Sequence, residues 1–267
     1  MSILKRRRNQ AFFDLITIRI RVLGKLFSSI FGFLEYYILE FLRLTGKIFH
    51  INSLNFVIKY IFKAKWGGRV IPISQSIDSH VKFLPSQEIL ELISRSNIVG
   101  LATCYCRDTQ RKHEITANCT HPLNTCIHLS YGNSLHEIPF KSENLREISK
   151  KRVKQLLIKF EDRGLIHQII FFPNPFYYYV ICNCCPCCCI VLSKFLKMGS
   201  PQIIKSDFIA ETNLNKCKNC GICSRWCYFG ARVINKKLEF KSNLCFGCGI
   251  CVNKCPEEAI VLKKRDN

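Results

Sequence analysis

The residues of this sequence that can do chemistry are its cysteines, and the most regularly spaced of them lie near the C-terminus. Residues 217–227 and 245–255 each contain four cysteines in the spacing C-x2-C-x2-C-x3-C. Thiolates are soft ligands that suit iron–sulfur clusters, and three closely spaced cysteines can surround one cluster from a single tight loop. The glycines that follow Cys220 and Cys248 let the backbone curl close to such a cluster and donate N–H groups to it. Each segment therefore predicts a site for an iron–sulfur cluster.

The two segments are copies of one unit. Residues 217–234 align with residues 245–262 at an offset of 28, and all four cysteines match. The repeat predicts a duplicated unit with pseudo-twofold symmetry. The fourth cysteine of each copy is expected on the following helical turn, pointing away from its own loop, so that it reaches the other cluster. The resulting ligands form a first set, Cys217, Cys220, Cys223 and Cys255, and a second set, Cys245, Cys248, Cys251 and Cys227.

This C-terminal stretch resembles the bacterial-type two-cluster ferredoxins over about 60 residues. The resemblance implies two [4Fe–4S] clusters and the transfer of single low-potential electrons. Cys255 is followed by Pro256, as in that family, whereas Cys227 is followed by Tyr228. The ligands are intact, so this departure concerns the path of a loop rather than the presence of a cluster. Four aromatic residues are expected to form an apolar shell, namely Trp226, Tyr228, Phe229 and Phe246.

Ten further cysteines lie upstream in two groups. The earlier group consists of Cys104, Cys106, Cys119 and Cys126. The later group places six cysteines within eight residues, namely Cys182, Cys184, Cys185, Cys187, Cys188 and Cys189. Alternate residues of an extended segment share a face, so Cys182 and Cys184 are expected to point the same way. Pro186 is expected to end the strand and to turn the last three cysteines.

These ten cysteines predict a metal centre between the two groups, as one or two further iron–sulfur clusters. Zinc, a redox-active dithiol and a set of buried thiols are the alternative interpretations. Each group lies at the end of an apolar stretch, 98–105 for the earlier group and 177–182 for the later one. If these two strands belong to one sheet, the groups can converge at its edge. Thiolates left so close together without a metal would repel one another or oxidise.

A second resemblance covers about residues 70–265. It is carried by the stretches CYCR, GLIHQ and ICNCCPCCC, which look like those of a group of multi-cysteine ferredoxin-domain proteins from anaerobes. The resemblance implies electron transfer, with redox proteins as partners. The sequence therefore favours an electron carrier or wiring subunit. The alternatives are an iron–sulfur reductase whose catalytic metal is held by the central cysteines, and a zinc-stabilised scaffold with a ferredoxin tail.

Enzymatic motifs are otherwise lacking. The sequence contains no P-loop, no dinucleotide-binding glycine fingerprint, no Ser–His–Asp order and no paired carboxylates. Histidine can ligate iron in some clusters, but a lone histidine is more typical of a loop or of a core. The histidines near the central cysteines are His113, His121, His128 and His167. Whether the protein is an enzyme is left open, with the electron carrier preferred.

The elements that must position these residues form an α+β pattern in three segments. The expected segments are a basic amphipathic helical leader at 1–66, a cysteine-rich α+β domain at 67–200 and a two-cluster ferredoxin-type domain at 201–267. Within the central domain, helices are expected after Ser86 and after Ser149, the latter ending at Gly164. Strands are expected at 98–105, 165–171 and 177–182, and a polar loop at 107–125.

The charge and the leader suggest where the protein acts. The 40 basic and 19 acidic residues give a net charge of +21, and residues 1–83 hold 14 basic residues against 4 acidic ones. The wide apolar helix faces of the leader need a cover, which is either the rest of the protein or a membrane interface. Nucleic acid is not expected as a partner, because no recognition motif is present. No signal peptide or ordinary transmembrane helix is recognised, and the cysteine usage points to a reducing, anoxic cytoplasm.

Overall fold

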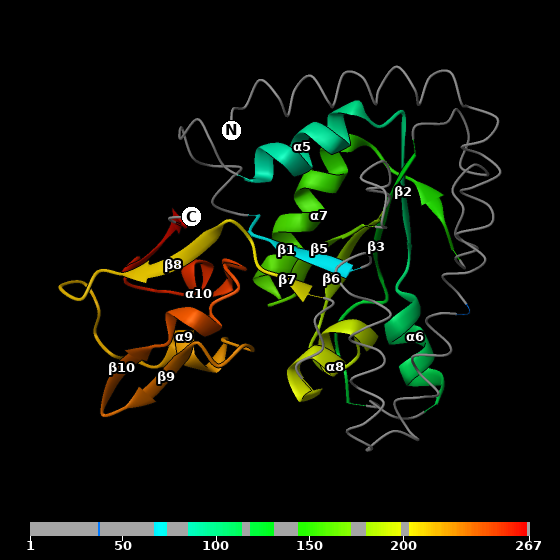
Figure 1. Cartoon of the computed structure of the whole chain (residues 1–267). Helices are drawn as coiled ribbons and strands as arrows, with labels where there is room; N and C mark the ends of the chain where they lie inside the picture. The colour runs from blue at the N-terminus through cyan, green and yellow to red at the C-terminus, as the bar shows by residue number, and fades with distance from the viewer. Residues whose placement is uncertain are drawn as a thin grey trace.

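The computed structural model describes residues 67–73, 85–113, 118–130, 144–171, 180–198 and 203–265, together with Tyr37 (Figure 1). The helical leader expected at 1–66 lies outside the described residues apart from that tyrosine. Both helices and strands are present, as the α+β pattern predicted. No helix among the described residues is long and apolar enough to cross a membrane.

A mostly antiparallel sheet forms the centre of the molecule. Its strands lie in the order β4-β2-β3-β6-β5-β1-β7, and only the β1–β7 pair is parallel. The strands are β1 (Gly67–Ile71), β2 (Ile98–Thr103), β3 (Asn124–Ser130), β4 (Arg146–Glu147), β5 (Ile166–Phe171), β6 (Val180–Cys184) and β7 (Ile203–Ile204). Because β2 and β6 both pair antiparallel with β3, they run in the same direction and their carboxyl ends meet at one edge.

Four helices flank this sheet within the described residues (Figure 1). They are α5 (Pro85–Arg95), α6 (Tyr105–Lys112), α7 (Lys150–Asp162) and α8 (Ile190–Met198). The apolar faces of α5 and α7 pack on one side of the sheet, where Ile93 and Leu157 join Ile127, Ile169 and Ile181 in one buried core. The other side of the sheet contacts α8 and the C-terminal module through a second apolar cluster.

The ends of α7 follow the local rules of helix formation. The hydroxyl oxygen of Ser149 accepts a hydrogen bond from the backbone N–H of Arg152 at 3.2 Å, which satisfies one unpaired donor of the first turn. Gly164 has a φ of 75° just beyond the last turn. Such a left-handed conformation favours glycine, so both the predicted start and the predicted stop of this helix are confirmed.

The prediction of a polar loop at 107–125 is wrong in its first part. The chain forms α6 as far as Lys112, and β3 begins at Asn124. The helix was not recognisable from apolar spacing, because the residues that it buries are Arg107 and Thr109. The ends of two strands also differ slightly from the predicted ones. The first central strand ends at Thr103 rather than at 105, and β6 continues to Cys184.

The C-terminal module consists of two short two-stranded sheets, two single-turn α-helices and one 3-10 helix, η2 (Figure 1). Its elements are β8 (Phe208–Thr212), α9 (Ile222–Arg225), β9 (Arg232–Asn235), β10 (Lys237–Phe240), η2 (Ser242–Leu244), α10 (Ile250–Asn253) and β11 (Ile260–Lys264). Strand β8 pairs with β11 and β9 with β10, both antiparallel.

The backbone of this module repeats with the sequence. Three pairs of residues, each separated by the repeat offset, have positive φ: Asn219 and Gly247, Gly221 and Gly249, Gly230 and Glu258. Matching left-handed positions mean that the two cysteine loops follow the same path. The tyrosine at position 228, which stands where the second copy has Pro256, therefore leaves the course of its loop unchanged.

Candidate metal centres

The cysteines of the first set gather around one small cavity of the C-terminal module. All four line a cavity of about 20 Å³, together with Gly221 and Pro256. Cys220 is exposed, whereas Cys223 is buried. Burial raises the pKa of Cys223, and the nearby charges of the other three thiols of the set raise it further. Cys255, the fourth cysteine of the second copy, thus lies beside the cysteine loop of the first copy.

The second set lies deeper in the protein. Burial raises the pKa of Cys251 to about 11, against an opposing effect of Arg232, and Cys245 and Cys227 are among the neighbours that raise it. Burial also raises the pKa of Cys248, with Cys251, Cys227 and Cys245 adding to the effect. Cys227 therefore lies with the loop of the second copy. Thiols with raised pKa values in an apolar setting are stable as thiolates only when a metal neutralises them.

A buried arginine lies between the two sets. The side chain of Arg232 is 2% exposed and donates hydrogen bonds to Thr212 Oγ1 at 2.6 Å and to the Ala210 carbonyl oxygen at 2.9 Å. Its charge opposes the effect of burial, which raises the pKa values of Cys223 in the first set and of Cys251 in the second. Sequence reasoning missed this residue. The only available signal was an arginine at the position where the other copy has an isoleucine.

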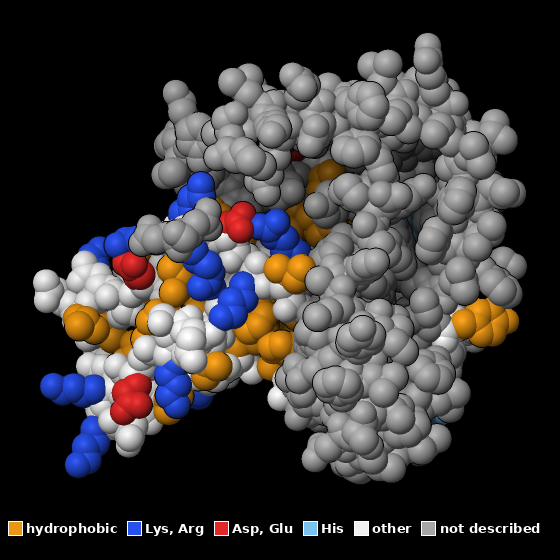
Figure 2. Space-filling view, viewed as in Figure 1, with side chains coloured by type: hydrophobic (Ala, Val, Ile, Leu, Met, Phe, Trp, Pro, Cys, Tyr) orange, Lys and Arg blue, Asp and Glu red, His pale blue; other side chains and the backbone are white. Residues whose placement is uncertain are grey.

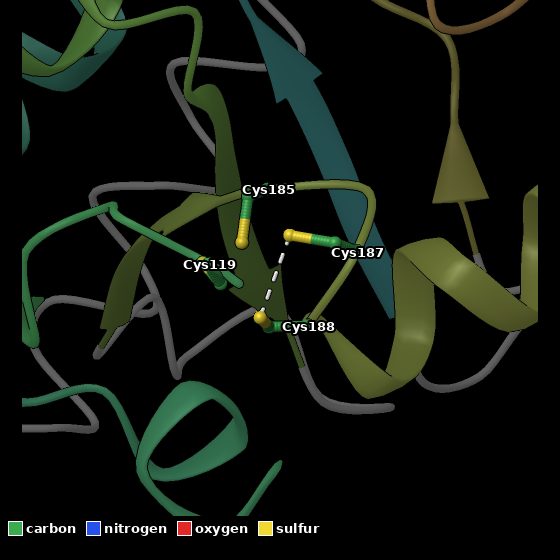
Figure 3. Close-up of side chains that lie close together, drawn as sticks. All are labelled: Cys119, Cys185, Cys187 and Cys188. Atoms are coloured by element: carbon green, nitrogen blue, oxygen red, sulfur yellow. Dashed lines mark hydrogen bonds between the residues drawn. The ribbon is translucent and has the colours of Figure 1, made fainter. Parts of the chain in front are cut away.

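The ten central cysteines are brought together, but as two separate groups rather than one. A four-cysteine group has all its sulfur atoms within 4.8 Å of one another and consists of Cys119, Cys185, Cys187 and Cys188 (Figure 3). Six others, here called the cavity cysteines, line a cavity of about 60 Å³. They are Cys104, Cys106, Cys126, Cys182, Cys184 and Cys189. Each group takes members from both upstream sequence groups.

Strand alternation explains this division. Cys182 and Cys184 of β6 point to the same side, as predicted, and share it with Cys126 of β3 and Gln168 of β5. Cys185, the next residue, points to the opposite side of the sheet and packs in the core beneath α5 and α7. The turn at 186–188 then carries the chain back, so that Cys189 rejoins the cavity. The two predicted strands do share a sheet, although β3 lies between them.

The cavity cysteines form a continuous chain of sulfur contacts. Hydrogen bonds link Cys126 to both Cys104 and Cys182, and those bonds lower the pKa of Cys126 well below its ordinary value. Further links join Cys182 to Cys184, Cys184 to Cys189 and Cys189 to Cys106. The cavity therefore presents a row of six soft donors, a donor set that suits an iron–sulfur cluster or another thiophilic metal.

Two polar side chains that the sequence reasoning overlooked border these groups. Gln168 is fully buried on the cavity wall, and its amide group has no hydrogen-bond partner within the described part of the chain. Arg107 is 1% exposed and donates to the sulfur of Cys185 at 3.4 Å, to Thr125 Oγ1 at 2.9 Å and to the Asn183 carbonyl oxygen at 3.2 Å. Neither could be distinguished by spacing, because each acquires its surroundings only when the sheet forms.

The four histidines do not join the four-cysteine group. His128 lines the cavity and is buried, and His113 is exposed. Burial and the neighbouring arginines lower the pKa of the half-buried His121. His167 is buried, with Nδ1 2.6 Å from Asn183 Oδ1, as expected for a core histidine with a partner.

The C-terminal module contacts the central domain near the second set. Trp226, Tyr228, Phe229 and Phe246 pack in one apolar cluster with Cys184, Cys189 and Cys248. Phe229 and Phe246 stack with their ring centroids 4.2 Å apart. Burial raises the pKa of Tyr228 to about 12, and the charges of Cys185, Cys248 and Cys187 add to this effect. Tyr228 therefore lies near both the four-cysteine group and Cys248 of the second set.

Comparison with known families identifies part of this arrangement. Residues 238–261 match the 4Fe-4S binding domain family, and they include Cys245, Cys248, Cys251 and Cys255. The chain therefore carries a 4Fe-4S binding domain near its C-terminal end, and the thiol donors present there fit a cluster of that type. No curated protein matches the chain.

Proposed function

We propose that this protein is a ferredoxin-type electron carrier or wiring subunit. It moves single low-potential electrons through two [4Fe–4S] clusters, held by the first and second sets, and holds a further metal centre among its central cysteines. The observation that carries the proposal is the position of Tyr228, which packs in one apolar cluster with Cys248 of the second set and with Cys184 and Cys189 of the central domain. A ferredoxin module that exchanged electrons only with external partners would not need one ligand set packed against another group of cysteines.

The two sets differ in solvent exposure in a way that suits electron transfer through the module. Cys220 of the first set is exposed and Cys217 is half-buried, so this set is accessible to a redox partner. Cys245 and Cys251 of the second set are buried, and Cys248 packs against the central domain. One end of the module thus faces solvent and the other faces the protein interior.

The residues around the sets control the chemistry that they support. A bound [4Fe–4S] cluster accepts and releases one electron at a potential that its surroundings set. Phe229, Phe246 and Tyr228 exclude water from the second set, which disfavours added negative charge. Arg232 acts in the opposite direction, because its buried positive charge favours added negative charge at both sets.

The surface of the module suits an acidic redox partner. Residues 201–267 contain 12 basic and 6 acidic residues, and among the charged side chains of the module on this face Figure 2 shows more Lys and Arg than Asp and Glu. Complementary charge speeds the encounter of redox proteins more than it strengthens their complex. A peripheral membrane contact through 1–66 and a place in the cytoplasm remain part of the proposal.

A reductase is the second candidate function, and the cavity is the observation that favours it. Its six cysteines exceed the four that one cluster needs, and Gln168 presents a buried amide beside them. A metal there could keep a coordination position for substrate. Cyanide added to the reduced protein distinguishes the two functions: a carrier with full thiolate ligation keeps its electron paramagnetic resonance (EPR) spectrum, and an open site changes it.

The proposed function is tested by anaerobic purification of the full chain, with counts of iron, sulfide and zinc followed by an EPR redox titration. The two sets alone account for about eight irons. Cys227→Ser should damage the cluster of the second set, and Cys255→Ser that of the first, although each lies in the other loop. A protein that carries zinc without sulfide, or a single cluster, contradicts the proposal.

A further inference from the structure

We propose that the four-cysteine group is a separate, closed site for one tetrahedrally coordinated metal ion, either zinc or iron without sulfide. The inference deepens the central metal centre and rests on that part of the proposed function. It assigns the ten central cysteines to two sites of different chemistry. The cavity cysteines remain available for a cluster, and the four-cysteine group is set apart from them.

The sulfur positions fit one ion. All four sulfur atoms lie within 4.8 Å of one another, and those of Cys187 and Cys188 are 3.4 Å apart. A zinc–thiolate bond of about 2.3 Å places the sulfurs of a tetrahedral site about 3.8 Å apart. A [4Fe–4S] cluster binds each thiolate at a different iron atom and so spreads its ligands more widely. The compact group in Figure 3 therefore suits a single ion.

The ligands come from two segments that are independently held in place. Cys185 directly follows β6, and Cys187 and Cys188 lie in the turn that begins at Pro186. Cys119 comes from the loop between α6 and β3 (Figure 3). Arg111 fixes this loop by donating hydrogen bonds to the carbonyl oxygens of Cys119 and His121. The surrounding fold, rather than the metal alone, brings the four sulfurs together.

The charge of Arg107 supports thiolates at this site. Its guanidinium is buried and permanently charged, yet no carboxylate pairs with it within the described residues. A buried charge without a counter-charge is strongly destabilising, and a metal-bound thiolate at Cys185, which accepts a hydrogen bond from Arg107, would supply that counter-charge. Four thiolates around a divalent ion carry a net charge of −2, so Arg107 reduces the charge that the core must hold.

The burial of the ligands points to a structural or electron-relay role rather than to catalysis. Cys185 and Cys188 are each 1% exposed and belong to the main hydrophobic core. Only Cys187 is exposed. Four protein ligands complete a tetrahedral shell and leave no position for substrate. No disulfide joins any of the 18 cysteines, so the four thiols are available to a metal.

The test measures metal in excess of sulfide in the full-length protein. Iron and sulfide are equal in [4Fe–4S] clusters, so the proposal expects one further equivalent of zinc or iron per chain. X-ray absorption at the zinc edge, or Mössbauer spectroscopy of the iron, should report a mononuclear site with four sulfur ligands at about 2.3 Å. Metal equal to sulfide, with neither signature present, overturns the inference.

Matched variants locate the ion. Cys187→Ser, at the exposed ligand, should remove the extra equivalent and leave sulfide and the EPR signals of the C-terminal module unchanged. Cys189→Ser, two residues away but in the cavity, should keep the extra equivalent. If Cys187→Ser keeps it or Cys189→Ser loses it, the assignment is wrong. If the wild-type protein shows no EPR signals from the C-terminal clusters, the proposed function is contradicted instead. Failure of the metal-site proposal and failure of the proposed function are therefore distinguishable.

Discussion

At the scale of single residues, two buried arginines stand out as the groups that make dense thiolate sites tolerable. Arg107 contacts the four-cysteine group, and Arg232 lies between the two sets of the C-terminal module. Both are bound by neutral oxygen acceptors rather than by carboxylates. Their full positive charges therefore act on the thiolates, with little screening because water is excluded.

We predict that Arg232→Met lowers the reduction potentials of both C-terminal clusters, on the order of 50 mV each. Removing a buried positive charge makes each added electron less favourable. Redox titration followed by EPR measures the two potentials. Arg225→Met, at the exposed end of α9, is the matched control and should change them little. Unchanged potentials in Arg232→Met would show that this charge does not act on the clusters.

The buried His167 predicts a loss of stability in acid. Burial lowers its pKa to about 4, although the hydrogen bond with Asn183 raises it. Between pH 6.5 and 4 the unfolded chain therefore binds a proton that the folded protein does not, so stability falls as the pH falls. The contribution is about 2 kcal/mol between pH 7 and pH 5. Urea unfolding at the two pH values measures it, and His167→Gln should make the loss smaller by that amount. An equal loss in both proteins would assign the acid sensitivity to other groups.

At the scale of elements, the end of α7 is the joint between the central domain and the C-terminal module. Asn253 of α10 donates a hydrogen bond to Asp162 Oδ1 at 3.1 Å, and Lys254 donates to the Asp162 carbonyl oxygen. A side chain at Gly164 would place its Cβ 2.1 Å from Trp226 Cζ3. The bare glycine surface is thus what allows the indole to pack against the helix end.

Gly164→Ala should therefore loosen the module from the central domain. The expected result is faster amide hydrogen exchange at the last turn of α7 and at α10, with clusters still bound. Gly230→Ala is the control, because it has the same left-handed backbone, with φ of 68°, but no atom within 4 Å of the new Cβ. Both variants carry the backbone penalty of about 1 kcal/mol, and only the first adds the clash. Equal exchange in the two variants would show that this contact does not hold the module.

At the scale of the whole molecule, the cysteine groups differ in exposure: Cys220 of the first set is exposed, whereas most of the central cysteines are buried. The chain has a net charge of +21, and residues 1–83 contribute 14 basic residues against 4 acidic ones. Anionic partners are the expected consequence. Exposed charges act over about 8 Å at physiological ionic strength, so their effect depends on salt.

We predict that the full-length protein binds anionic lipid vesicles and that binding weakens as salt increases. Apolar burial of the leader and attraction of its basic residues to the lipid headgroups would act together. Vesicle co-sedimentation across a salt series measures this, with neutral vesicles as the control. A protein lacking 1–66 should remain in the supernatant. Salt-independent behaviour, or equal binding by the shortened protein, would assign the apolar faces of the leader to the protein's own core.

The features determined by the sequence alone are those that short stretches of chain decide. Ligand spacing within a single loop specified the iron–sulfur chemistry of residues 245–255. A serine cap and a left-handed glycine specified the limits of α7. Such signals depend on a few neighbouring residues, because a hydrogen bond across one turn or a loop around one cluster needs nothing more distant.

Only the tertiary structure decided how the ten central cysteines divide. Their assignment depends on the pairing of β3 with β6, on the parity that sends Cys184 and Cys185 to opposite faces, and on the turn at 186–188. The roles of Arg107 and Arg232 and the polar buried face of α6 were hidden for the same reason. A buried charge is recognisable only from the groups that surround it, and segments far apart in the sequence bring those groups together.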